Sequence, residues 1–519
     1  MPSLEKLGRL LSAAASARGD RHTMDGLGIP SLILMERAAL AVAHEIRERY
    51  AAAGREVVVL AGPGNNGGDG LAAARQLCGW GIPARVHLCT ERRNDVVDAQ
   101  IRLARALGVE VVEGLPSGAP ADQTIVVDAL LGTGSTGAPR GAIAEALDWL
   151  AAARGPKVAI DVPTGVDPDA GVVLGRAAAV DLTVTMQSSK PGLHITPGRD
   201  HAGIVVVADI GLVAAPGEGE GERADAVAWL ISPWAVRERA AAGDRAAHKG
   251  ERGHVGVLGG SPGTPGAAIL AATAALRCGA GLVTAAALDP AIEPLIIGSR
   301  PELMVERLDP GAWGERPLAR ADVLIVGPGL TRAADRQELA RLWREDPRPA
   351  IWDASSLDEI PPGGDARPAA VRILTPHPGE AQRLLERLGD DAAIDVRRER
   401  RAAARALARR TGAIVVLKGA GTLVDDGARL AIAVSGGPGL ATAGSGDCLT
   451  GFIAALLAGP GGREEPFAAA CGGVHLHGVA GELAVADGPG ALALDIAALA
   501  GAAKGAPPSH RRWPQLRLN

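Results

Sequence analysis

The chain has 519 residues, of which 47% are hydrophobic and only 2% aromatic, so its cores are built from small and branched aliphatic side chains and it is long enough for two to four domains. Its formal net charge is −5, and basic residues alternate with acidic ones, which excludes a basic surface for nucleic acid. No uncharged apolar run of about 18 residues predicts a membrane span, and the first residues lack the apolar core of a signal peptide, so we expect a cytoplasmic protein that binds neither membrane nor nucleic acid.

Six short apolar runs rich in β-branched residues recur in the first 213 residues, with helical patterns between several of them. They are residues 56–62, 84–90, 124–132, 157–165, 182–187 and 203–211. This alternation is typical of βαβ units in a mainly parallel sheet. We therefore predict an α/β fold, with a Rossmann-like three-layer αβα domain over residues 1–213.

The first of these runs leads into "GPGNNGGDG", residues 62–70, before a helical pattern. Its glycines satisfy G-x-G-x-x-G, the fingerprint of dinucleotide-binding dehydrogenases. Asn65, Asn66 and Asp69 oppose that interpretation, because a carboxylate beside a pyrophosphate is repulsive unless it points into the protein and braces the loop. A dehydrogenase would also need a site for hydride transfer, and none is evident.

Polar residues follow two further predicted strands: Asp128 after one, and Asp161 with Thr164 after the next. Ligands of open α/β sheets bind at the carboxyl ends of the strands. Asn, Asp and Thr oxygens suit a hard cation. The turn "GTGSTGA", residues 132–138, can offer backbone amides to phosphate.

These motifs, together with "LMERAA" (34–39), "AIDVPTGVD" (159–167) and the segment 185–212, resemble the NAD(P)H-hydrate epimerase family over residues 10–213. The resemblance implies K⁺ bound by Asn66, Asp128 and Thr164, and Asp161 as the acid/base group in contact with the substrate. It implies that the hydrated nicotinamide nucleotide is held by Asn65, Asn66, Gly67, Gly68, Asp69, Gly132, Thr133, Gly134, Ser135, Thr136, Gly137, Ala138 and Asp161.

An acidic, glycine-rich segment at residues 214–227 is predicted to be a linker, after which the pattern of apolar runs restarts. The runs are residues 254–260, 282–288, 323–329, 349–355, 372–378, 413–419 and 421–427. We predict a second α/β domain over residues 228–505. Residues 506–519 are expected to form a peripheral tail.

The strongest motif of the second block is "GSGD", residues 444–447, at the start of a long apolar helix. Free amides and the helix dipole make such a terminus suitable for phosphate, although an Asp there is also a common helix cap. Asp447 beside an anion can act as the base on a hydroxyl that attacks a γ-phosphate.

The segments "HKGERGHVGVLGG", "GPGL", "TPHPGE", "KGAGT" and "ATAGSGD" resemble the ribokinase-like superfamily and, within it, the ADP/ATP-dependent NAD(P)H-hydrate dehydratases, over residues 228–500. The resemblance implies Asp447 as base and Mg²⁺ on the phosphates. It implies that the hydrated nucleotide faces Ala267, Gly329, His377 and Asp447, and that ADP or ATP is held by Lys418, Gly419, Ala420, Gly421, Thr422 and Gly446. Ser355 stands where relatives often have a second acid, so altered metal assistance is expected.

The two resemblances together imply metabolite repair. The first domain would equilibrate the R and S forms of hydrated NADH or NADPH, and the second would dehydrate the S form at the expense of ADP or ATP. A homo-oligomer is expected. The alternatives are a ribokinase-superfamily kinase of a vitamin precursor fused to a nucleotide-binding domain, and a nucleotide-binding regulatory protein without turnover.

Overall fold

The computed structural model divides the chain into two compact units, one of residues 1–229 with 510–519 and one of residues 230–509. We call them the N-terminal and the C-terminal unit. The structure describes the whole chain except residues 1–7, 51–54, 214–225, 235, 237–247, 310–312, 314–316, 332–335, 363–366, 390–393, 487, 507–513 and 519.

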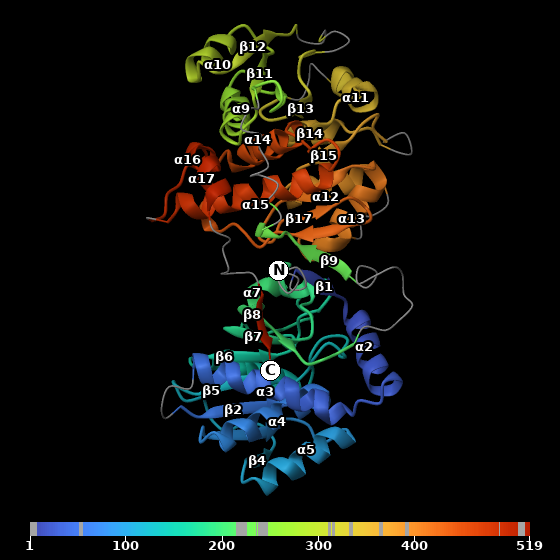
Figure 1. Cartoon of the computed structure of the whole chain (residues 1–519), viewed down its shortest axis with the longest axis vertical. Coiled ribbons are helices and arrows are strands. Elements are labelled where there is room, and N and C mark those ends of the chain that lie inside the picture. The colour runs from blue at the N-terminus through green and yellow to red at the C-terminus, as the bar shows by residue number, and fades with distance from the viewer. Residues whose placement is uncertain are drawn as a thin grey trace. The chain divides into compact units, whose positions relative to one another are not determined.

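The N-terminal unit contains an eight-stranded sheet in which all neighbouring strands are parallel (Figure 1). All six apolar runs predicted in this unit form strands of this sheet. The order is β19 (Gln515–Leu518), β8 (Ile204–Asp209), β7 (Leu182–Met186), β6 (Lys157–Ile160), β5 (Ile125–Ala129), β2 (Val57–Ala61), β3 (Ala84–Leu88) and β4 (Glu110–Glu113).

Helices cover both faces of this sheet, which confirms the αβα prediction. On one face α3 (Ser31–Arg49), α4 (Asn65–Gly79) and α5 (Asp95–Ala106) share a core with Val57 and Val59. On the other face α6 (Ala142–Ala152) packs against the alternate β2 residues Val58 and Leu60. Because both faces are covered, β2 is apolar at every position, as expected for a central parallel strand. The unit also contains α2 (Ala13–Arg21), α7 (Gly198–Ala202), the π-helix His22–Gly26 and the 3₁₀ turn Pro191–Leu193.

The end of the chain corrects the predicted boundaries. The sequence suggests a peripheral tail at 506–519, whereas Gln515–Leu518 form β19, which pairs in parallel with the edge strand β8. Backbone pairing with an exposed edge needs no distinctive side-chain pattern, so no local pattern of residues predicts this strand. Most of the predicted linker lies outside the described residues, but its last two residues already belong to β9 (Ala226–Leu230), which pairs antiparallel with β1 (Arg9–Leu11).

The C-terminal unit is built on a sheet that is parallel except for the antiparallel pairs β16–β17 and β17–β18. All seven predicted runs form strands. The order is β18 (Leu430–Ile432), β17 (Leu423–Asp425), β16 (Ile414–Leu417), β15 (Arg372–Leu374), β14 (Ala350–Trp352), β13 (Val323–Val326), β10 (His254–Leu258), β11 (Leu282–Ala287) and β12 (Met304–Arg307).

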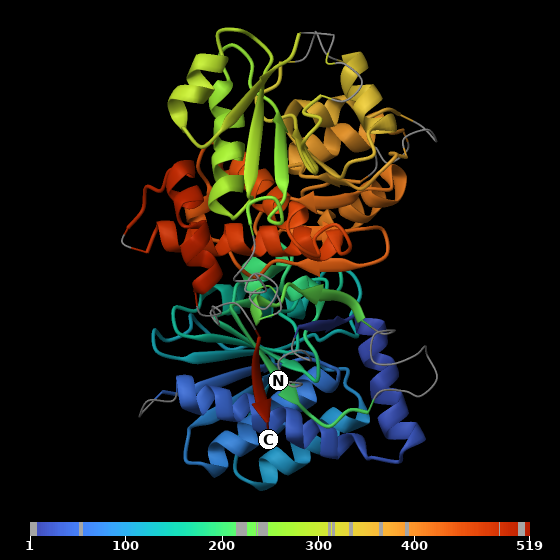
Figure 2. The ribbon, with the colours of Figure 1, turned by 45° about the horizontal axis from the view of Figure 1, so that its top comes forward.

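Small residues let the main helices of this unit approach closely. Helix α14 (Ser445–Ala458) packs against α9 (Pro265–Arg277) and α15 (Pro466–Ala484), as Figure 2 shows. A Cβ added to Gly451 would lie 2.4 Å from the Ala271 carbonyl oxygen, so only glycine fits at this crossing. The remaining helices are α10 (Glu293–Ser299), α11 (Arg336–Glu345), α12 (Pro378–Arg387), α13 (Arg400–Thr411), α16 (Ala493–Ala498), α17 (Ala500–Gly505) and the 3₁₀ segments Ala354–Glu359 and Pro438–Leu440.

All five cysteines are free thiols, and four of them are buried. Among the helices described, none combines the length and the apolar character that a membrane crossing demands.

Candidate active sites

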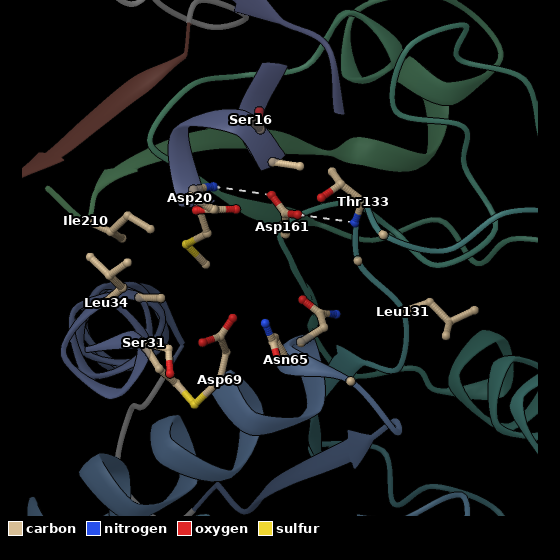
Figure 3. Close-up of a pocket in the computed structure, with 18 of the residues that line it drawn as sticks. Ser16, Asp20, Ser31, Leu34, Asn65, Asp69, Leu131, Thr133, Asp161 and Ile210 are labelled. Carbon is tan, nitrogen blue, oxygen red and sulfur yellow. Dashed lines mark hydrogen bonds between the residues drawn. The ribbon is translucent and has the colours of Figure 1, made fainter. Parts of the chain in front are cut away.

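A cavity of about 590 Å³ opens in the N-terminal unit, where the loops after β2, β5 and β6 meet α2 and α3 (Figure 3). It lies at the carboxyl ends of these parallel strands, as expected for a ligand site of an open α/β sheet. The predicted residues that line it are Asn65, Asn66, Asp69, Gly132, Thr133, Gly134, Ser135 and Asp161.

The other predicted residues of the two glycine-rich turns do not line this cavity. Gly67 is packed against the Gly62 carbonyl, where an added Cβ would lie 2.2 Å from the oxygen, and at Gly68 it would meet the Met35 side chain at 2.7 Å. Both glycines therefore allow close packing of α4. Thr136, Gly137 and Ala138 follow the part of the second turn that lines the cavity.

Asp161 is held by hydrogen bonds from four groups. Its Oδ1 accepts from Lys190 Nζ at 2.7 Å, from Thr185 Oγ1 at 3.2 Å and from the Met186 amide at 3.4 Å, and its Oδ2 accepts from the Thr133 amide at 3.4 Å. Burial raises the pKa of Asp161, but the Lys190 ammonium and these hydrogen bonds outweigh it, so the pKa lies below its usual value. The carboxylate is therefore ionised.

The backbone of Asp161 has φ +65°, a conformation that costs free energy for a residue with a side chain. The residue follows directly on β6, and this turn directs its carboxylate toward Lys190 and the cavity. Lys190 is almost fully buried, with 2% of its side chain exposed. The two charges thus form a buried ion pair at the wall of the cavity.

Two further carboxyl groups, of Asp20 and Asp69, face the same cavity from α2 and α4 (Figure 3). Burial raises the pKa of both, well above the usual value for Asp69, where the charges of Asp161 and Asp20 add to the effect. Asp69 does not brace the loop, because its carboxyl accepts no hydrogen bond from any described residue.

Asp128 and Thr164 are hydrogen-bonded to each other, and neither is among the residues that line the cavity. The Asp128 carboxylate accepts from the Thr164 hydroxyl at 2.7 Å, from the Thr164 amide at 2.8 Å and from the Leu130 amide at 3.2 Å. Burial raises the pKa of Asp128, opposed by these hydrogen bonds. The Asn66 side chain lies beside Gly132, where an added Cβ would be 3.3 Å from its Oδ1, and its buried Nδ2 has no hydrogen-bond partner in the described part of the chain.

In the C-terminal unit, four charged side chains meet at the carboxyl ends of β14, β15 and β16. Lys418 Nζ lies 2.8 Å from Asp353 Oδ1 and 3.8 Å from Glu380 Oε2. Asp447 completes the group from the first turn of α14. Burial and the neighbouring charges of Asp353 and Glu380 raise the pKa of Asp447 to about 6, although Lys418 opposes the shift.

The start of α14 offers free backbone donors beside this group. Gly444 caps the helix with φ +84°, and the amides of Gly446 and Asp447 bind no backbone acceptor in the described residues. A Cβ added to Gly446 would lie 3.3 Å from Lys418 Nζ, so an ammonium and free amides face one space. This combination suits a phosphate.

The loop 418–422 connects β16 to β17, and hydrogen bonds from the Arg400 side chain stabilise it. This buried guanidinium donates to the carbonyl oxygens of Ala420 at 2.5 Å and of Leu417 and Lys418 at 3.3 Å. Its hydrogen bonds leave the predicted nucleotide residues Lys418, Gly419, Ala420, Gly421 and Thr422 in one ordered turn.

The remaining predicted residues lie at the same edge of the sheet. Gly329 follows β13, and an added Cβ there would lie 3.0 Å from that of Ala267. His377 caps α12 through Nδ1, which accepts from the amides of Gly379 and Glu380, and its Nε2 lies 3.4 Å from Glu380 Oε1. The Ser355 hydroxyl donates to the Leu330 carbonyl at 2.8 Å.

Sequence reasoning assigned no role to several residues that the fold brings to these sites. Lys190 stands out only as one of six lysines in a chain rich in arginine. Asp20 lies in an alanine-rich helix without any motif. His477 is buried in α15, its Nε2 lies 3.2 Å from the Ser445 hydroxyl at the start of α14, and burial lowers its pKa to about 4.

Comparisons with known proteins match both units. Residues 31–192 match the YjeF-related protein N-terminus family and residues 255–499 the NAD(P)H-hydrate dehydratase family. Over 473 residues the chain is 36% identical to the bifunctional NAD(P)H-hydrate repair enzyme Nnr of Escherichia coli, covering 90% of this chain and 88% of that protein. The corresponding enzyme of Moorella thermoacetica is 38% identical over 507 residues, covering 91% of this chain and 92% of that protein.

A solved structure was also matched, that of the ADP/ATP-dependent NAD(P)H-hydrate dehydratase of Bacillus subtilis co-crystallised with ATP and Mg²⁺. It is 27% identical, covers 53% of this chain and 96% of the solved chain, and has a TM-score of 0.45.

Proposed function

The chain belongs to the family of bifunctional NAD(P)H-hydrate repair enzymes, and from this premise we propose which of its residues perform the two activities of the repair. It is an epimerase and an ADP/ATP-dependent dehydratase of hydrated NADH and NADPH. We assign epimerisation to the cavity of the N-terminal unit and dehydration to the charged group around Lys418. The assignment of residues to each activity is our inference.

Dehydration needs a leaving group better than hydroxide, and phosphorylation supplies one. We infer that Asp447 takes the proton from the hydroxyl of the S-hydrate as that oxygen attacks the terminal phosphate of ADP or ATP. Lys418 and the amides of Gly446 and Asp447 bind the transferred phosphate. The phosphate then leaves with the electron pair of the C–O bond, and the neighbouring ring carbon loses a proton to water, which restores the ring double bond. The observation that carries this assignment is Asp447, with a pKa of about 6, at a helix start that faces Lys418.

For the N-terminal unit we propose that Asn65, Asn66, Asp69 and Gly132–Ser135 hold the hydrated nucleotide beside Asp161. For K⁺ we propose Asn66, Asp128 and Thr164 as ligands. Their fit is supported by the oxygen atoms of the hydrogen-bonded pair Asp128 and Thr164 and by the unpartnered amide of Asn66, whose oxygen and nitrogen assignments can be exchanged. A bound K⁺ would offset negative charge on the nucleotide.

For Mg²⁺ we propose that ADP or ATP phosphates and water supply most of the ligands. The described residues contain no cluster of three His, Cys, Asp or Glu side chains suited to a metal ion, which agrees with the way Mg²⁺ usually accompanies nucleotides. The cytoplasmic location and the homo-oligomeric state both stay predictions.

Repair can be tested by following reduced-nicotinamide absorbance. The protein is incubated with hydrated NADH and ADP or ATP, starting from the pure R or the pure S epimer. We expect absorbance to return from both, and from R only after epimerisation. A stable phosphorylated product without recovered NADH would contradict the proposal. The same assay with choline in place of K⁺ tests whether epimerisation needs K⁺.

The dehydratase activity should depend on pH through Asp447. The carboxylate must be ionised to accept a proton, so kcat/KM is expected to fall about tenfold per pH unit below pH 6 and to level off above it. The charged groups that face Asp447 are Asp353, Glu380 and Lys418. A pH profile measured with the S epimer that stays flat between pH 5 and 7 would contradict the role of Asp447 as base.

A further inference from the structure

Two carboxyl groups of the N-terminal cavity differ completely in their hydrogen bonding. Asp161 accepts from Lys190, Thr185 and two backbone amides, so most of its lone pairs are occupied. Asp69 lines the same cavity and accepts no hydrogen bond from the described residues. Asp69 is thus free to exchange a hydrogen bond or a proton with a ligand, whereas Oδ1 of Asp161 is already occupied by three donors.

The surrounding charges separate the two groups further. Lys190 stabilises the ionised form of Asp161, whereas the charged neighbours of Asp69 are the carboxylates of Asp161 and Asp20. These like charges and burial favour a protonated Asp69, in agreement with its raised pKa. The surroundings in this one cavity therefore favour an ionised carboxylate at Asp161 and a protonated carboxyl group at Asp69.

The reaction that we have assigned to this cavity uses both forms, and the following inference rests on that assignment. Water added across the ring double bond beside nitrogen leaves the hydroxyl on a carbon bonded to that nitrogen. When this C–O bond breaks, the nitrogen lone pair forms a C=N bond and the ring becomes a cation. The hydroxyl needs a proton to leave as water. The other epimer forms when water adds to the opposite face of the cationic ring and gives up a proton.

We propose that Asp69 donates this proton to the leaving hydroxyl and takes one back from the water that adds, while Asp161 remains ionised beside the cationic ring. Each cycle breaks one C–O bond, forms one C–O bond, and leaves Asp69 protonated as it began. This moves proton transfer from Asp161, where the sequence analysis assigned it, to Asp69. Lys190 then positions Asp161.

Asp20 is the natural rival, because its carboxyl also faces the cavity and has no hydrogen-bond partner in the described residues (Figure 3). Two observations favour Asp69. Lys190 acts on Asp20 and favours its ionised form, but it is not among the charges that act on Asp69. Asp69 also lies one turn along α4 from Asn65 and Asn66, which we propose hold the nucleotide.

The test compares the Asp69→Asn, Asp69→Glu and Asp20→Asn variants of the full-length protein. Each is given the R epimer of hydrated NADH, and S is measured against a protein-free sample. For Asp69→Asn we expect kcat to fall about 10²- to 10⁴-fold with little change in KM. The kcat of Asp69→Glu should be at least tenfold higher than that of Asp69→Asn. The kcat of Asp20→Asn should stay within about tenfold of the wild-type value. Thermal unfolding checks the N-terminal unit of each, and Asp69→Ala serves as a second neutral variant.

Asp69→Asn and Asp69→Ala activity within threefold of the wild type would overturn the proposal. A rise in KM with kcat unchanged would also overturn it, because Asp69 would then only bind the substrate. A greater loss of kcat in Asp20→Asn than in Asp69→Asn would assign the proton transfer to Asp20. If the wild-type protein itself does not epimerise the hydrate, the assignment of this cavity fails instead, whatever the variants do.

Discussion

The Asp447→Asn variant is expected to lose dehydration of the S epimer, by about 10²- to 10⁴-fold in kcat, and to keep epimerisation at the wild-type rate. Asparagine preserves the size of the side chain at the start of α14 but cannot accept the proton of the attacking hydroxyl. The amides of Gly446 and Asp447 and the Lys418 ammonium remain, so binding of ADP or ATP should change little. Absorbance recovery from pure S epimer and nucleotide binding are the two measurements.

Glu386→Gln is a suitable control for this variant. Glu386 is an exposed carboxylate on α12, in the same unit as Asp447, and among the described residues its side chain pairs with Gln382. Its loss should leave both activities unchanged. If Asp447→Asn lowered epimerisation as strongly as dehydration, two independent sites would no longer account for the activities.

The Lys190→Met variant is expected to lose both epimerisation and stability of the N-terminal unit. Lys190 Nζ donates to Asp161 at 2.7 Å, to Thr185 Oγ1 at 2.9 Å and to the Met186 carbonyl at 3.1 Å. Removal of one partner from a buried ion pair leaves an uncompensated charge, which destabilises folded proteins by about 3–5 kcal/mol. Chemical unfolding at pH 7 measures the loss.

The pH dependence of this loss has a definite sign. The pKa of Asp161 is depressed in the wild type, so the pair stabilises the fold above the ordinary pKa of Asp and ceases to do so as pH falls through the depressed value. Without Lys190 the carboxyl is protonated at a higher pH. The difference in unfolding free energy should therefore be largest near pH 7 and shrink toward pH 4.

The double variant Lys190→Met with Asp161→Asn separates charge from packing. It removes both charges and should recover much of the stability without recovering epimerisation. If the double variant were as unstable as Lys190→Met, the lost contacts of the lysine stem, and not the uncompensated carboxylate, would explain the loss.

The strands of both units could be predicted because their signal is local. Runs such as residues 57–61 and 323–326 are apolar at every position, since helices cover both faces of the sheet. Strand β19 could not be predicted in this way. Its pairing with β8 uses backbone groups at a sheet edge, and the choice of edge depends on where the end of the chain lies in the fold.

Part of each candidate site could be predicted because its signal is also local. Asn65, Asp161, Lys418 and Asp447 each follow a strand or begin a helix, so local patterns place them at the binding edge of a sheet. Glu380 had no assigned role, because its significance comes from its distance to Lys418 and not from a motif.

The amino-acid sequence by itself determined the two α/β units, the edges of the sheets where ligands bind and the type of each catalytic side chain, because strand, turn and helix signals depend on neighbouring residues. Only the tertiary structure decided the states of those side chains. Lys190 meets Asp161 across 29 positions of the chain, and Asp20 and Asp69 come from separate helices to one cavity. Charge, burial and hydrogen bonding at a carboxyl group depend on what surrounds it in space, and for that reason the roles of Asp69 and Asp161 could be distinguished only in the folded protein.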